Sequence, residues 1–191
     1  ILLVIPALSF AGNRSWKIQS PDNKISMTIK QDSIKKTLSY NVDILSNTHV
    51  NIVEKSTLGI ERKDQKFVDN LEFLNQSEIK IIDETYSMLV GRKSGFRNYA
   101  NETSLMFKNT RGALLRIDVR VYNDGVAFRY VFPEISDRKY TVTKELSTFR
   151  FSTNGKAWIQ PYDKPSKWTP GYEKYYENAV PIGSASPNAE G

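Results

Sequence analysis

Two glutamates near the C-terminal end of the sequence are the residues best suited to chemistry. Glu173 and Glu177 lie four positions apart in the segment Gly-Tyr-Glu-Lys-Tyr-Tyr-Glu, residues 171–177. Paired carboxylates can serve as the general acid and base of sugar hydrolysis when their environments separate their pKa values. A spacing of four would place both carboxylates on one face if the segment were helical.

The surroundings of these glutamates leave other interpretations open. Tyr172, Tyr175 and Tyr176 lie beside them in a proline-rich segment. Carboxylates and tyrosines in such a segment can bind a cation through oxygen ligands, or hydrogen-bond a sugar. A third interpretation assigns no function: the acids form a solvated edge, and the tyrosines pack on the rest of the fold.

The scarcity of histidine and cysteine excludes most other catalytic sites. The 191 residues include one histidine, His49, and no cysteine, so a nucleophilic triad would need His49. His49 lies in a polar turn, residues 47–50, between strand candidates, where we expect a surface or hairpin histidine. The glycines are spaced singly and form no phosphate-binding loop. Without thiolates, a metal site must use oxygen ligands or His49, which favours calcium or magnesium rather than zinc.

An alternation of apolar and polar residues predicts that β-strands position these groups. It runs through residues 24–29 and 38–44, with a polar connection at 31–36, and is typical of half-buried antiparallel strands. One short segment, 71–76, could form a single helical turn. Further strand candidates are residues 56–61, 78–93, 103–108, 139–144, 148–151 and 156–159.

The strongest local signal lies between residues 115 and 132. Two alternating runs are separated there by Asn-Asp-Gly at 123–125, which predicts a tight hairpin in which Gly125 accepts a positive φ. Many short strands without a long helical period indicate an all-β fold, an antiparallel β-sandwich of two large sheets.

Length and composition fit one large domain followed by part of something else. The chain of 191 residues excludes a complete (β/α)8 barrel, which needs about 250. With 39% hydrophobic and 25% charged residues, it has the composition of a globular protein. We place the sandwich at residues 12–159. Residues 160–191 are rich in proline and aromatic residues, and we expect them to lead to a further domain.

The first eleven residues indicate export. Residues 1–11 are uncharged and mostly apolar, with Ser9 and Ala11 at the small-residue positions before a cleavage site. We interpret them as the end of a secretory signal; a buried N-terminal strand is the alternative. The run is shorter than the roughly 20 residues of a membrane-spanning helix. Together with the absence of cysteine, this favours a bacterial periplasmic or secreted protein.

The charge pattern gives no reason to expect a nucleic-acid partner. The sequence has 27 basic and 21 acidic residues, a net charge of +6. The basic residues are scattered among acids and apolar residues, and no zinc-finger or RNA-binding motif accompanies them. Solvated strand faces rich in lysine explain the excess.

Several segments, taken in order, resemble one family. Residues 20–24, 56–61 and 97–102 are each weakly specific, whereas the stretch YNDGVAFRY at residues 122–130 is specific. Over residues 15–177 the sequence resembles the N-terminal domain of glycoside hydrolase family 97.

This resemblance implies a β-sandwich that precedes a catalytic (β/α)8 barrel and a small C-terminal β domain. The family comprises calcium-dependent, exo-acting α-glucosidases and α-galactosidases, whose catalytic carboxylates belong to the barrel. We therefore expect no catalytic residue in this chain and no activity from it alone. Its role would be to buttress the barrel and complete the rim of a site for an oligosaccharide or other α-glycoside.

The resemblance also implies one metal ligand in this chain. The family's N-terminal domain lends a glutamate to the calcium site at the barrel mouth, from a stretch that here contains Glu173 and Glu177. Calcium there would position the substrate hydroxyls or the attacking water. Tyr172 and Tyr175 would contact the substrate or pack at the domain boundary.

Two other functions stay open from the sequence alone. A free-standing periplasmic carbohydrate-binding sandwich could use Trp158, Trp168 and Tyr172 as sugar platforms. A structural or adhesion sandwich would bind no ligand.

Overall fold

The computed structural model describes residues 13–45, 48–152, 154–161, 165–168 and 175–185. The chain divides into two compact units, Ile1–Phe149 and Arg150–Gly191. Each unit is described by itself. In the described ranges all regular structure is β, which confirms the predicted all-β class.

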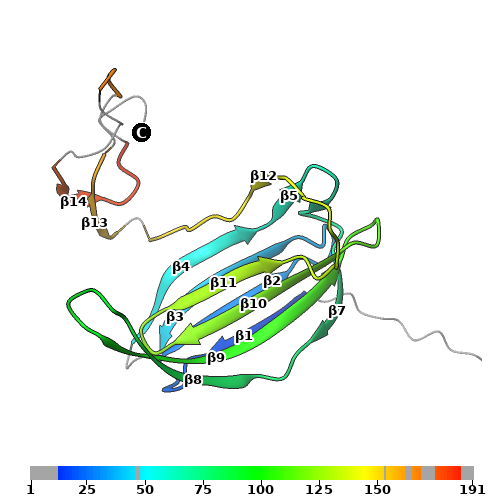
Figure 1. Ribbon diagram of the computed structural model, residues 1–191, viewed down its shortest axis with the longest axis horizontal. Helices are drawn as coiled ribbons and strands as arrows, with labels where there is room; N and C mark the ends of the chain where they lie inside the picture. The colour runs from blue at the N-terminus through cyan, green and yellow to red at the C-terminus, as the bar shows by residue number, and fades with distance from the viewer. Residues whose placement is uncertain (1–12, 46–47, 153, 162–164, 169–174, 186–191) are drawn as a thin grey trace, which may run out of the picture. The chain divides into compact units, whose positions relative to one another are not determined.

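The first sheet consists of four consecutive antiparallel strands (Figure 1). They are β1 (Arg14–Gln19), β2 (Ile25–Gln31), β3 (Leu38–Leu45) and β4 (His49–Leu58). The alternation predicted at 24–29 and 38–44 is confirmed, because Met27 and Ile29 of β2 are fully buried. The polar connection between β2 and β3 is the hairpin turn that the sequence predicts.

The second sheet has the order β11-β10-β9-β7, and β8 pairs with the first half of β9. Its strands are β7 (Glu72–Gln76), β8 (Lys80–Ser87), β9 (Gly95–Lys108), β10 (Leu114–Tyr122) and β11 (Val126–Val131). The predicted hairpin at 115–132 is confirmed, with Val121 opposite Val126. One detail differs from the prediction. Gly125 does not have a positive φ, so the backbone angle at this position does not require glycine.

A small third sheet joins distant parts of the first unit. It has the order β12-β5-β6, formed by β12 (Val142–Glu145), β5 (Ile60–Arg62) and β6 (Lys66–Phe67). The polypeptide continues along β4 after β12, where Thr148 N–H donates to the Thr57 carbonyl at 3.1 Å. The segment 145–149 thus closes the edge of the first sheet.

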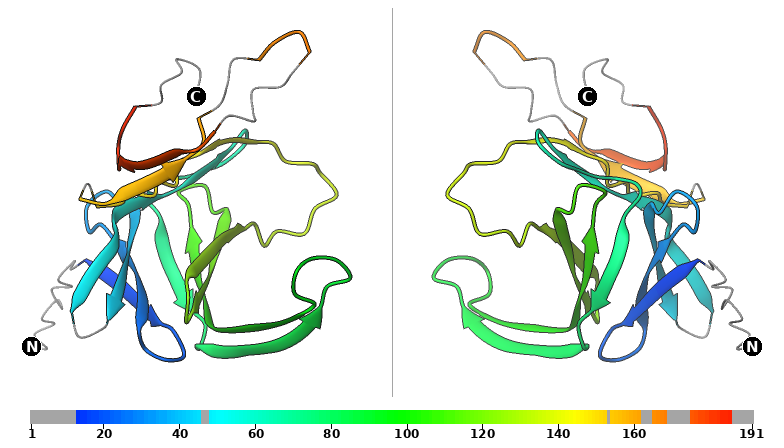
Figure 2. Two further views of the ribbon diagram at one scale, coloured as in Figure 1. Left: turned by 90° about the vertical axis from the view of Figure 1, so that its left-hand side faces the viewer. Right: turned by 90° about the vertical axis from the view of Figure 1, so that its right-hand side faces the viewer.

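The core lies between the two large sheets, which face one another (Figure 2). Its side chains come from the inward-facing positions of both sheets, from Ile60 and Phe67 of the small third sheet, and from Leu71 in the β6–β7 connection. Strand β10 alone buries four aliphatic side chains completely, because every second residue faces inward. The largest fully buried side chains are Tyr40, Phe67, Phe107, Ile18, Met27, Ile29, Leu71, Leu105, Leu115, Ile117, Val119 and Val121.

Three local expectations are corrected. Residues 71–76 do not form a helical turn: Glu72–Gln76 is strand β7, paired with β9 across a register shift. Residues 148–150 form no strand. Strand β1 was not predicted, although Trp16 and Ile18 alternate in the core.

The second unit contains one strand pair in its described part. Strand β13 (Lys156–Ile159), at the predicted position, pairs antiparallel with β14 (Glu177–Pro181). Glu177 therefore begins a strand, and the helical spacing considered for Glu173 and Glu177 is wrong for Glu177.

Candidate functional site

The single histidine belongs to a hairpin, as expected. His49 is the first residue of β4, and its Nε2 lies 3.1 Å from Oδ1 of Asp43. The same carboxylate accepts hydrogen bonds from the amides of Asn41 and Asn51, at 2.6 and 2.7 Å. Asp43 thus binds three side chains that order the end of the β3–β4 pair, and these contacts place His49 against a carboxylate and two amides.

The predicted site residues are only partly placed. Tyr175 is 96% exposed, and Glu177 is an exposed residue at the start of β14. Tyr172 and Glu173 lie outside the described residues, so the pairing of the two glutamates stays a prediction. In the parts of the chain that are described, no three acidic or histidine side chains come together to hold a metal ion.

The outer face of the second sheet carries an ordered charge network that sequence reasoning missed. Asp118, at the centre of β10, accepts hydrogen bonds from Ser104 (2.7 Å), Arg116 (2.8 Å) and Arg129 (2.9 Å). Burial opposes ionisation of Asp118, but these hydrogen bonds outweigh it and hold its pKa below the ordinary value. Two arginines thus surround one aspartate, and its oxygens are occupied by hydrogen-bond donors, so Asp118 is not available as a base.

A second carboxylate on this face is held in the same way. Glu102 of β9 pairs with Arg120 of β10 and, at 2.9 Å, with Lys80 of β8. Desolvation again works against the charge, and hydrogen bonds from Lys80 and Arg120 overcome it, so the pKa of Glu102 is lowered. A general acid in sugar hydrolysis needs a raised pKa, which neither Glu102 nor Asp118 has.

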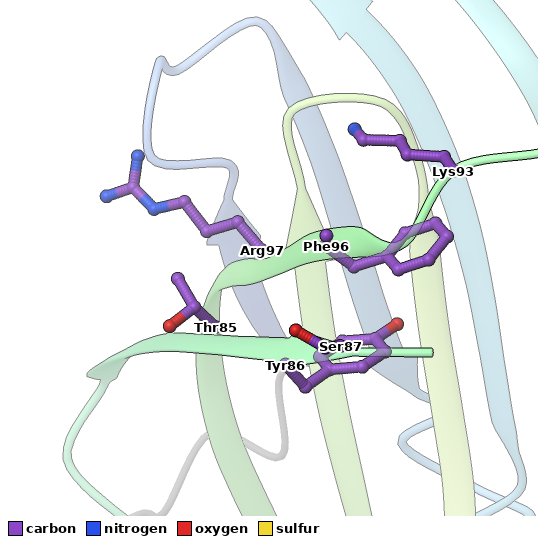
Figure 3. Close-up of a pocket in the computed structure, with 7 residues that line it drawn as sticks. Thr85, Tyr86, Ser87, Lys93, Phe96 and Arg97 are labelled. Atoms are coloured by element: carbon purple, nitrogen blue, oxygen red, sulfur yellow. The ribbon is translucent and has the colours of Figure 1, made fainter. Parts of the chain in front are cut away.

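The end of the β8–β9 hairpin contains an open pocket of about 390 Å³ (Figure 3). Tyr86 and Phe96 stack across it with ring centroids 5.4 Å apart, and the Lys93 ammonium lies 5.5 Å from the Phe96 centroid. Arg97, at its rim, pairs with Asp83 at 2.7 Å. The described residues that line this pocket include no acid. It offers aromatic and cationic contacts, and no acid–base chemistry.

The tip of the same hairpin exposes apolar side chains. Met88, Leu89 and Val90 are 48%, 103% and 80% exposed. Three consecutive exposed apolar residues on a projecting hairpin are typical of a surface that another part of a protein covers.

These features define a β-sandwich domain with charge pairs on one sheet and an apolar hairpin tip. Its described residues do not bring together the paired acid and base that sugar hydrolysis needs. The sequence matches the family described as glycosyl-hydrolase 97 N-terminal over residues 18–190. The chain therefore belongs to the N-terminal domain family of glycoside hydrolase family 97, as its resemblance implied.

Two curated relatives match most of this chain. A probable retaining α-galactosidase from Streptomyces bingchenggensis is 28% identical over 167 residues, which is 86% of this chain and 25% of the relative. A retaining α-galactosidase from Bacteroides thetaiotaomicron is also 28% identical, over 87% of this chain and 23% of the relative. The chain thus spans about a quarter of the length of the curated relatives it matches.

Solved structures confirm the fold. A β-arabinopyranosidase crystal structure superposes with a TM-score of 0.79 and 26% identity, over 90% of this chain and 27% of that one. A family 97 enzyme from Pseudoalteromonas sp. strain K8, in complex with panose, gives a TM-score of 0.69 at 22% identity, over 86% of this chain and 24% of that one. At 22% identity, this second similarity is evidence for the fold alone.

One further finding concerns membranes. Among the described residues, no helix has the length and apolar character needed to cross a bilayer.

Proposed function

We propose that this chain is the N-terminal sandwich of a secreted, calcium-dependent, exo-acting α-glycoside hydrolase. The observation that carries the proposal is the match of residues 18–190 to the family's N-terminal domain. Both curated relatives described above are retaining α-galactosidases by name, which favours an α-galactoside as the substrate. The catalytic carboxylates would come from a barrel that follows this domain in the whole protein.

The sandwich would act by supporting that barrel. Its exposed apolar tip at residues 88–90 provides a surface that the barrel could cover. The charge networks of Asp118 and Glu102 make the second sheet rigid, because each carboxylate is held by donors from neighbouring strands. A rigid sheet would hold the hairpin, and with it the active-site rim, in a fixed place.

Calcium would be held in part by Glu177 or Glu173. A solvent-exposed glutamate supplies the hard oxygen ligand that calcium prefers, and Glu177 makes no ion pair among the described residues. The chain's contribution to the site would be this one carboxylate, and the other ligands would come from the barrel. Bound calcium supplies charge that polarises and orients oxygen groups of the substrate or water.

Hydrolysis assays on the whole protein test the proposal. We expect cleavage of p-nitrophenyl α-galactoside that is lost with EDTA and restored by calcium, and no cleavage by the 191-residue chain alone. Glu177→Gln and Glu173→Gln are tested for calcium affinity, with the exposed Glu78→Gln as the control. Calcium affinity unchanged in both variants would remove the metal role, and cleavage by the chain alone would contradict a barrel-borne active site.

A second function is supported by two exposed tryptophans. Trp158 and Trp168 are 61% and 82% exposed, and the Lys167 ammonium lies 5.0 Å from the Trp168 ring centre. Exposed tryptophans can stack on sugar rings, so the chain could also bind carbohydrate as a module. Titration with galactosides or malto-oligosaccharides, followed by tryptophan fluorescence, tests this; no response up to millimolar sugar would contradict it.

A further inference from the structure

A polar groove of about 920 Å³ lies along the first sheet, within the first unit. Strand residues that alternate with core positions line it: Lys30 of β2, Ser39 of β3, and Lys55 and Thr57 of β4. The β2–β3 connection and the segment around Thr148 complete its walls. Its volume is that of a site for a molecule of several rings.

The floor of the groove is a row of hydrogen-bonding groups that crosses the sheet. Lys30 of β2 lies opposite Ser39 of β3, and Ser39 lies opposite Thr57 of β4, so the three residues form one row across three strands. The row continues to Thr148, whose Oγ1 is 3.1 Å from Oγ1 of Thr57 and accepts the Thr57 N–H at 2.8 Å. The Thr57 hydroxyl also donates to the Leu146 carbonyl at 2.7 Å, so the row is fixed before a ligand binds. Its oxygens are preorganised to accept hydrogen bonds from the hydroxyls of a ligand.

The loop that forms one wall is fixed by its own hydrogen bonds. The Asp32 carboxylate accepts the backbone N–H groups of Ile34 and Lys35 at 2.9 and 2.6 Å. The Lys35 carbonyl in turn accepts the N–H of Asn70 at 2.8 Å. The backbone that carries Lys35 is therefore held in place before any ligand arrives.

The groove carries excess positive charge. Lys30, Lys35 and Lys55 line it, and none has a carboxylate within ion-pair distance among the described residues. Asp32 is the one acid among the described lining residues. Hydrogen bonds from the backbone of Lys35 and Ile34 lower the pKa of Asp32, so its charge is already engaged. Three lysines against one aspartate leave a net charge of +2.

Neutral sugars have no aromatic platform in this groove. Among the described residues that line it, Tyr40 is the one aromatic residue, and Tyr40 is 2% exposed. Its ring packs on Phe128 and Phe149, with centroids at 5.5 and 6.3 Å. A ligand would therefore have to be recognised through charge and hydrogen bonds.

We propose that this groove binds an acidic oligosaccharide. Its carboxylate or sulfate groups would pair with Lys30, Lys35 and Lys55, while its hydroxyls bond to the row from Ser39 to Thr148. The groove would anchor the enzyme to acidic glycans whether or not the proposed α-glycosidase activity holds.

Calorimetric titration of the 191-residue chain tests the proposal with three probes: tetragalacturonate, a sulfated heparin tetrasaccharide and neutral maltotetraose. We expect one or both acidic probes to bind and maltotetraose to bind at least tenfold more weakly, with acidic binding weakening as salt rises. A preference between the two acidic probes identifies the anionic group that the groove recognises.

Variants locate the binding. Lys30→Gln with Lys55→Gln should weaken acidic binding about tenfold or more, because each removes a charge-assisted hydrogen bond. Lys17→Gln is the matched control, since Lys17 is an exposed lysine of β1 outside the groove. Circular dichroism checks that each variant folds. No acidic binding up to millimolar concentration, equal binding of maltotetraose, or equal losses in Lys17→Gln and the double variant would each overturn the proposal.

Discussion

The guanidinium carbon of Arg62 lies 3.8 Å from the centre of the Tyr140 ring, and 4.7 Å from that of Phe132 on β11's C-terminal extension. The Arg62 side chain is only 2% exposed. It forms two hydrogen bonds to Asp64, at 3.0 and 2.6 Å, and one to Glu134. One buried cation thus ties β5 to the long connection between β11 and β12.

Replacement of Arg62 should be among the most destabilising single changes in the sandwich. Arg62→Met removes the cation from between two rings and leaves Glu134 without its partner, and we expect a loss of about 2–3 kcal/mol. Urea denaturation measures the free energy of unfolding. The exposed neighbour Lys63→Met should change it by less than about 0.5 kcal/mol; equal effects at both positions would contradict the role of Arg62.

The charge network around Asp118 should make stability depend on pH. Its pKa is lowered in the folded state, so its contribution is complete above the unfolded pKa, roughly 4, and is lost as pH falls through the folded value. Asp118→Asn should therefore be less stable than the natural sequence at pH 7, and the difference should narrow at pH 3. Denaturation at both pH values, with exposed Asp69→Asn as the control, measures this. A difference that stays constant with pH would exclude the carboxylate charge as the cause.

Much of the fold was predictable because its signals are local. The hairpin at 115–132 combines two alternating runs with a turn sequence, and the structure forms it in the expected register. The pattern of residues 71–76 carries no such signal. Strand β7 exists because it pairs with β9 at the sheet edge, across a register shift between Phe73 and Asn75. Its strand state is decided by tertiary pairing, which the local sequence does not contain.

The long-range side-chain contacts and the candidate site were less predictable for a related reason. Arg62 meets Glu134 across 72 residues, and Asn101 donates its amide to the Gln19 carbonyl across 82. No spacing rule links such positions. Glu177 was recognised as a candidate ligand by its residue type and surroundings, but the helix considered for it is a strand because Glu177 pairs with Ile159 of β13.

Two glycines in hairpin turns should respond differently to the same substitution. Gly112 has a φ of +85°, whereas Gly125 does not have a positive φ, and an added Cβ meets no atom within 4 Å at either. Gly112→Ala should cost about 1–2 kcal/mol, since an L-residue is strained in that region. Gly125→Ala should cost less than about 0.5 kcal/mol. Thermal or chemical denaturation distinguishes them; equal costs would show that backbone angle is not the determining factor.

The apolar tip of the β8–β9 hairpin gives a test of whether the proposed barrel packs against the sandwich. Leu89 and Val90 are 103% and 80% exposed in this chain, so Leu89→Ser with Val90→Ser should leave the stability of the 191-residue chain unchanged. If the proposed barrel covers the tip, the same variant of the whole protein loses burial of two aliphatic side chains, each contributing about 1.5–3 kcal/mol.

The whole-protein variant should then unfold at a lower temperature, or show the sandwich melting separately from the barrel in calorimetry. Ile135→Ser is the matched control, because Ile135 is also 103% exposed but lies on a different loop. An unchanged calorimetric profile for the tip variant would show that the barrel does not cover the hairpin. Only the tip variant changes the surface assigned to the barrel. Equal changes in the calorimetric profiles of both variants would therefore contradict a specific role of the tip.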